Sequence, residues 1–165
     1  MTAPIFTDAF AHHVWATDRL FDVCSSLTDE QLAEPVPGTY GSIFDTLRHL
    51  VGSDAWYLYV ITEGRVPRID EESMTLPELR KQMATHGALW ASVIAERTDP
   101  TQVVEVHRDD GTTGHAPIGI RLAQVVHHGT DHRSQICTAL TLLGITPPEI
   151  DVWDFGSVDG RVYDD

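Results

Sequence analysis

The sequence has few cysteines, few basic residues and no long hydrophobic run. It contains two cysteines in 165 residues, and both Cys24 and Cys137 fall in segments with a helical pattern. A secreted, disulfide-stabilised fold would need more cysteines with more loop between them, so we exclude it and expect both to be small buried residues. The 11 lysines and arginines face 25 acidic residues, for a net charge of −14. Such a surface repels phosphate backbones and anionic lipids, so we expect no nucleic-acid or membrane partner.

The most apolar stretch, residues 51–62, contains Asp54 and is too short to cross a bilayer. No signal-peptide core follows Met1, because Thr7, Asp8 and two histidines interrupt the apolar residues. We therefore expect a cytoplasmic protein. The length suits one ordinary domain, residues 1–165, and a hydrophobic fraction of 42% is enough for a core.

Apolar residues recur at helical spacing in four long segments. Two of these segments open with a capping-box pair, Ser42 with Asp45 and Thr75 with Glu78, in which each partner can bond the other's backbone N–H. Glycines follow the second and fourth segments, as is typical of helix C-termini. The predicted helices cover about 5–26, 42–63, 75–97 and 119–143.

A different pattern separates the third and fourth helices. Valines at 103, 104 and 106 precede Asp109-Asp110-Gly111, and residues 112–118 follow, which predicts a short β-hairpin. After residue 145 we expect an extended tail packed along the helices. The fold class is therefore predicted as all-α, a four-helix bundle with a short β-hairpin inserted between helices three and four.

Three histidines stand out as metal ligands. His128 and His132 are four residues apart on a predicted helix, so both imidazoles project from one face. The residue after His128 is glycine and not glutamate, which excludes the zinc-protease motif. His49 lies among apolar residues of the second helix, where an unpartnered imidazole would be costly. Nitrogen ligands alone suit zinc, nickel, iron or copper, although unrelated histidines show the same spacing.

Other polar residues are weaker candidates for a role at this metal site. The remaining histidines are expected at the surface or the rim, with 12 and 127 bordering the site: His12, His13, His86, His107, His115 and His127. Polar residues three or four positions from a ligand histidine could orient its second ring nitrogen: Asp45, Ser53, Gln124 and Gln135. Asp131 and Arg133 are expected to be exposed charges or to pair between helices.

Several motifs together resemble those of the DinB-like (DinB/YfiT) metal-binding four-helix bundles. They are Trp15-Ala16, the segment 42–49, Asp54-Ala55-Trp56, and the run from His128 through His132, Arg133 and Gln135 to Ile136. The resemblance covers nearly the whole chain. It implies that His49, His128 and His132 bind a divalent transition metal, zinc or nickel first, with iron or manganese as further options.

The resemblance also implies a function, because characterised relatives include thiol S-transferases that use bacillithiol, mycothiol or glutathione, and a mycothiol-dependent isomerase. The leading hypothesis is a metal-dependent transferase that joins a small thiol to a small electrophile. A free thiol has a pKa of about 8.5, and binding to a cation would deliver it as thiolate. No catalytic residue is assigned.

Two alternatives remain open at this stage. The same ion could activate water for hydrolysis, or the protein could hold metal for binding or stress response without turnover. Carboxylated thiols would need an anion-binding patch, for which the candidates are Arg19, Arg48, Arg65, Arg68, Arg121 and Arg133. Apolar bundle faces make a homodimer plausible.

Overall fold

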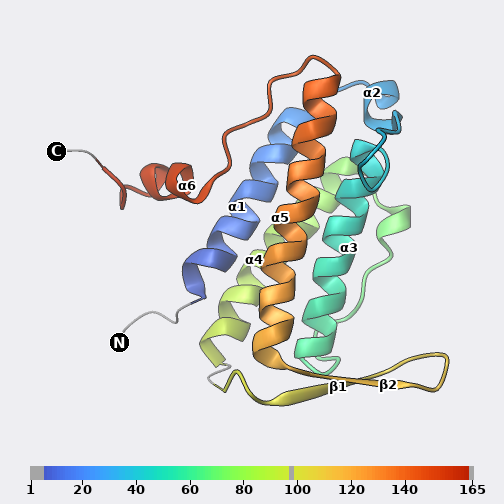
Figure 1. Ribbon diagram of the computed structural model, residues 1–165, viewed down its shortest axis with the longest axis vertical. Helices are drawn as coiled ribbons and strands as arrows, with labels where there is room; N and C mark the ends of the chain where they lie inside the picture. The colour runs from blue at the N-terminus through green and yellow to red at the C-terminus, as the bar shows by residue number, and fades with distance from the viewer. Residues whose placement is uncertain (1–5, 97–98, 164–165) are drawn as a thin grey trace.

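A computed structural model describes residues 6–96 and 99–163 of the chain. Its four long helices are α1 (Thr7–Cys24), α3 (Ile43–Ile61), α4 (Leu76–Glu96) and α5 (Ile118–Leu142). Each packs against two neighbours, so that α1 and α3 both contact α4 and α5 (Figure 1). The predicted bundle is confirmed. The predicted ends at Ile5 and Arg97 lie outside the described residues.

The capping pairs identified in the sequence set the starts of two helices. Ser42 Oγ accepts a bond of 3.0 Å from the Asp45 N–H, and the Asp45 carboxylate accepts one of 3.2 Å from the Ser42 N–H. Before α4, the Thr75 N–H donates to Glu78 Oε2 at 2.8 Å. Gly64, with a φ of +83°, ends α3 because this left-handed conformation lets its N–H reach back into the last turn.

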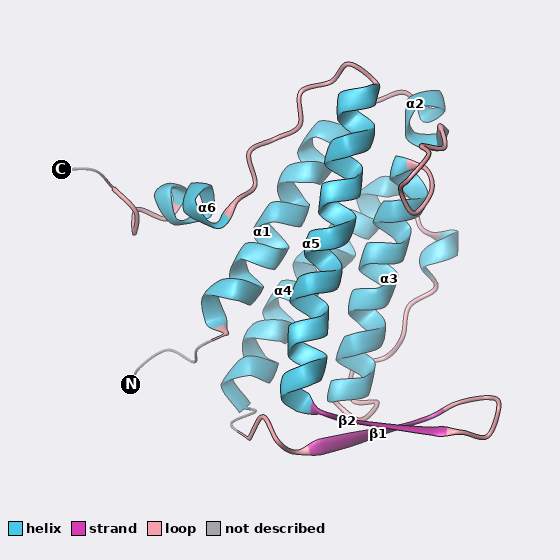
Figure 2. Cartoon of the chain, viewed as in Figure 1, coloured by secondary structure: helices cyan, strands magenta, loops and turns pink. Residues whose placement is uncertain are grey.

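The hairpin is also confirmed. Strand β1 (Val103–His107) pairs antiparallel with β2 (Thr113–Pro117), and Glu105 lies opposite His115. Figure 2 shows the two strands lying across the end of the bundle where α3 ends and α5 begins. The hairpin therefore leads directly into the helix that carries two of the predicted ligands.

Three short elements were not predicted. They are α2 (Asp29–Ala33), the 3₁₀ turn η1 (Glu71–Ser73) and α6 (Val152–Val158). The prediction of an extended tail is wrong for α6, because Asp151 and Asp154 form a capping box that starts a helix there. Figure 1 shows α6 on the α1 side of the bundle, where its Phe155 ring contacts the Trp15 ring of α1, with centroids 5.5 Å apart. Among the described residues, no helix is long and apolar enough to cross a membrane.

The bundle core consists of two hydrophobic clusters. One includes Leu20, Leu47, Met83 and Ile136, and the other, nearer the hairpin, includes Phe10, Leu58, Trp90 and Val125. At the level between them, each long helix contributes one buried polar side chain: His13, Asp54, His86 and Arg133. We call these four residues the polar layer.

Candidate metal centre

The three predicted ligand histidines lie together between α3 and α5. One ring nitrogen of each of His49, His128 and His132 falls within 4.8 Å of the other two, and the Nε2 atoms of His49 and His128 are 3.1 Å apart. One helical turn separates the two histidines of α5, so both face the neighbouring helix α3. The fold thus brings together residues far apart in the chain, although binding of an ion by them stays a prediction.

The distance between two of the ring nitrogens fits a tetrahedral cation. Nitrogens bound at 2.0–2.1 Å around such an ion stand roughly 3.3 Å from each other, and the two Nε2 atoms of His49 and His128 are 3.1 Å apart. Without an ion, two nitrogens that face each other need one of them to carry a proton. His132 is buried and the other two rings are half-buried, so three fixed imidazoles leave an approach from outside.

Electrostatics keep these rings in the form that binds metal. Burial, followed by the nearby His132 and His49, lowers the pKa of His128 to about 4. The pKa of His49 is also lowered, by burial and then by His132, while the Glu71 carboxylate acts in the opposite direction. Both imidazoles are therefore neutral at pH 7, with a lone pair available.

Gln135 orients one ring, as the sequence analysis suggested. Its Oε1 accepts from His132 Nδ1 at 3.0 Å, which leaves Nε2 of that ring unprotonated and free to bind a cation. The same oxygen accepts from the Tyr40 N–H at 3.0 Å. The Tyr40 ring stacks on His49, with centroids 4.0 Å apart and planes 15° apart. Tyr40 lies in a loop without periodicity, so the sequence did not point to it.

The other three candidates for this role do different things. Asp45 is engaged in the cap of α3, so the interpretation that it orients a histidine is wrong. The Gln124 amide donates to Tyr57 Oη at 3.4 Å, and Ser53 lines a cavity beside Trp56. Neither forms a hydrogen bond with a ligand ring among the described contacts.

Glu71 is a second residue that the sequence did not reveal. Its carboxylate lies across Gly52 of α3, where an added Cβ would come 2.4 Å from Glu71 Cδ. Gly52 follows His49 by three residues and so shares its helix face. Glu71 and Tyr40 line, with His49, one cavity of about 370 Å³. The signal was a glycine in a helix interior, which indicates a close approach by another group.

The polar layer joins α5, which carries two of the three histidines, to the other long helices. His13 Nε2 donates to Asp54 Oδ1 at 3.1 Å, and its Nδ1 accepts from Arg133 Nη1 at 2.9 Å. Asp54 Oδ2 accepts from Trp90 Nε1 at 2.9 Å and lies 2.9 Å from His86 Nδ1. Arg133 is thus tied to the other helices through these bonds. Because it follows a ligand histidine directly, the layer fixes the rotation of α5.

The predicted surface positions of His12, His13 and His86 are wrong, since all three are buried. His12 bonds to the Ile150 carbonyl at 2.8 Å, which holds the segment before α6. The predicted surface positions of His107 and His115 are confirmed by exposure. His127 is exposed as well, and its predicted place at the border of the site stays a prediction.

The two cysteines do not contribute a nucleophile. Cys24 is fully buried, and burial raises the pKa of its thiol to about 12. Burial also raises the pKa of Cys137. Raised pKa values keep both thiols protonated at neutral pH and so make them poor nucleophiles.

Comparison with known proteins agrees with this description. The model of the DinB family matches residues 1–159. A crystal structure of a DinB-like protein from Bacillus cereus superposes with a TM-score of 0.64 at 17% sequence identity, covering 92% of this chain and 100% of that one. No curated protein matches. The match to the family model spans nearly the whole sequence, and the chain therefore belongs to the DinB family.

Proposed function

We propose that the protein is a metal-dependent thiol S-transferase, with His49, His128 and His132 as the ligands of a zinc or nickel ion. The observation that carries the proposal is the convergence of three imidazoles, one of which lines an open cavity. A divalent ion held there would lower the pKa of a coordinated thiol and so supply a thiolate at neutral pH. A homodimer and a single domain over residues 1–165 remain predictions.

The chain's own residues would prepare this site in three ways. Gln135 fixes the tautomer of His132, and the stacked Tyr40 ring limits the movement of His49. The Glu71 carboxylate lines the same cavity as His49, as do Asp45 and Glu72, and is a candidate to accept the proton that the thiol releases. The cavity of about 370 Å³ is within the size range of small-molecule sites.

The first test measures metal and thiol consumption together. Protein purified without an affinity tag is analysed for metal, then assayed with monochlorobimane and glutathione, bacillithiol or mycothiol in turn. We expect one ion per chain and transfer with at least one thiol. His128→Ala should lose both, whereas His127→Ala, an exposed histidine one position earlier, should lose neither.

Other outcomes would assign a different function. Stoichiometric metal in His128→Ala would overturn the ligand assignment. Metal-loaded protein that consumes none of the thiols would overturn the transferase. Ester or amide turnover without thiol would then favour hydrolysis by an activated water, and ligand-induced thermal stabilisation without turnover would favour a binding protein.

A further inference from the structure

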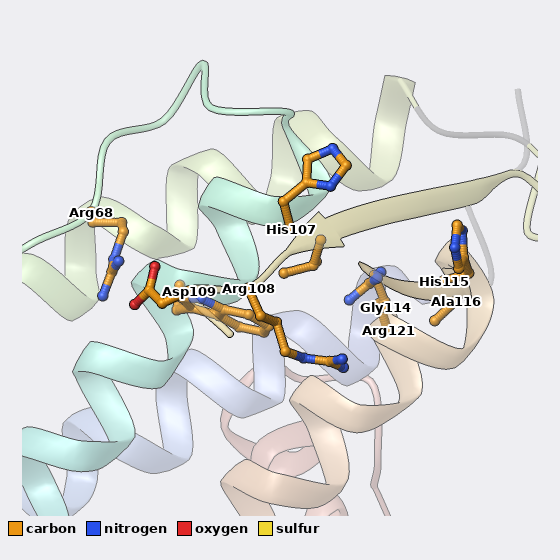
Figure 3. Close-up of a pocket in the computed structure, with 10 residues that line it drawn as sticks. Arg68, His107, Arg108, Asp109, Gly114, His115, Ala116 and Arg121 are labelled. Atoms are coloured by element: carbon orange, nitrogen blue, oxygen red, sulfur yellow. The ribbon is translucent and has the colours of Figure 1, made fainter. Parts of the chain in front are cut away.

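A second cavity, of about 450 Å³, lies where the hairpin meets the ends of α3 and α5. Three arginines line it, Arg68 from the loop after α3, Arg108 from the hairpin and Arg121 from α5, together with Trp56 and one carboxylate, Asp109. Figure 3 shows Arg68 and Asp109 on one side of this pocket and His115 on the other. A cavity with three guanidinium groups is unexpected in a chain of net charge −14.

No carboxylate forms a close ion pair with these guanidinium groups among the described residues. In the part of the chain that the structure describes, none of the three arginines lies within ion-pair distance of an aspartate or glutamate. Arg121 Nη2 donates to the Val104 carbonyl at 2.8 Å, but its Nε is buried without an acceptor. Guanidinium groups that line one cavity repel each other, and an anion bound in that cavity would relieve this repulsion.

The two hairpin histidines that line the pocket, His107 and His115, are each engaged with another hairpin residue. His107 Nδ1 bonds to Thr113 Oγ1 at 3.0 Å, and His115 Nδ1 lies 3.2 Å from the Glu105 carboxylate on the paired strand. Gly114 has no side chain where Arg108 crosses it, since an added Cβ would come 2.6 Å from Arg108 Nη2. The absence of a side chain there lets the guanidinium lie over β2.

The pocket lies on the same side of the bundle as the metal centre. Trp56 follows His49 by seven residues on α3, and Arg121 precedes His128 by seven on the antiparallel α5. Seven residues are two turns, or about 10.5 Å, and return to the same helix face. Trp56 and Arg68 also line an intermediate cavity with Glu71. That glutamate in turn lines the cavity of His49, so each cavity shares a lining residue with the next.

We propose that this arginine pocket binds the anionic end, carboxylate or phosphate, of the small molecule whose reacting end lies at the three histidines. The arginine pocket then narrows the class of thiol substrate, an inference that rests on the proposed function. The thiol would carry an anionic group roughly 10 Å from its sulfur. Binding of an anion by the arginine pocket can be measured without any turnover of a substrate.

The test is a titration of the zinc-loaded, ¹⁵N-labelled full chain, followed by NMR. One arm uses S-methylglutathione, which carries two carboxylates and no free thiol, and the other uses inorganic phosphate. We expect saturable shifts of the Arg121 side-chain N–H and the Trp56 indole N–H. Arg68→Gln and Arg108→Gln, both at exposed positions, should each weaken binding about tenfold, the effect of one charge-assisted hydrogen bond. Arg19→Gln, an exposed arginine of α1, is the matched control.

Each outcome decides between the proposals. Unchanged binding in Arg68→Gln and Arg108→Gln, or no saturable shift with either anion, would overturn the anion site. Tighter binding of phosphate with the same arginine dependence supports the site and assigns a phosphate ester to it. Arginine-dependent binding without any thiol transfer would overturn the proposed transferase and leave the anion site standing.

Discussion

The Asp54→Asn substitution tests whether the negative charge of Asp54 compensates the buried positive charge of Arg133. Asp54 is 2% exposed, as is Arg133, and His13 bridges the two through both of its ring nitrogens. Asparagine keeps the shape of the side chain but removes the negative charge, which leaves the guanidinium buried without a counter-ion. Breaking a buried pair in this way costs about 3–5 kcal/mol of the free energy of unfolding. In a domain of this size the melting temperature should fall by about 6–20 °C.

Thermal and urea denaturation followed by circular dichroism measure this loss. Asp131→Asn is the control, because it removes the same charge from an exposed position of α5 and should change stability by less than about 0.5 kcal/mol. In Asp54→Asn/Arg133→Met both charges are gone, so this variant should be more stable than the sum of the single losses predicts. Additive losses, or a single-variant loss below about 1 kcal/mol, would refute the reasoning.

The same layer gives a pH dependence of known sign. Burial alone would raise the pKa of Asp54, but hydrogen bonds and charge contacts with His13 and His86 outweigh it and hold the pKa below its ordinary value. A lowered folded-state pKa contributes stability above the unfolded value of about 3.9. That contribution is lost as the pH falls further. Wild type and Asp54→Asn should therefore approach each other in stability below about pH 4.

Three further predictions concern single contacts. Gly129→Ala would place a Cβ 2.4 Å from His13 Nδ1, and we expect a loss of about 1–3 kcal/mol in urea denaturation. Gln135→Leu removes the acceptor for His132 Nδ1, so metal affinity in a chelator competition should fall about 10–100-fold while circular dichroism is unchanged. Ser42→Ala removes the cap of α3 and should cost about 1 kcal/mol in thermal denaturation. Wild-type values in any of these assays would contradict the corresponding contact.

Features that depend on short spacings were predicted well. The capping pair at Ser42 and Asp45 marks the start of α3 within one residue, and the valines before Asp109 mark the hairpin. The interval between His128 and His132 needs only helix geometry to place both rings on one face. α6 was missed although Asp151 and Asp154 form the same kind of box, because the prolines before it and its seven-residue length favoured an extended tail.

The contacts between elements were predicted less well. Each helix contributes one member of the polar layer, so no single helix pattern shows that His13, Asp54 and Arg133 meet. Glu71 lies in a short segment between α3 and α4, and the only sign of its position in the sequence was the glycine at position 52, inside a helix. The contacts of His13 with Asp54 and Arg133 join residues 41 and 120 positions apart, beyond the reach of any periodicity argument.

By itself the sequence determined the helices, their caps, the hairpin and the paired imidazoles of α5, because hydrogen bonding and side-chain direction within one element follow from neighbouring residues. Only the tertiary structure decided that His49 faces this pair, that Glu71 shares its cavity, and that three arginines and Trp56 line one pocket. These contacts between distant residues depend on how the helices pack, and that packing is set by the burial of all their apolar faces together.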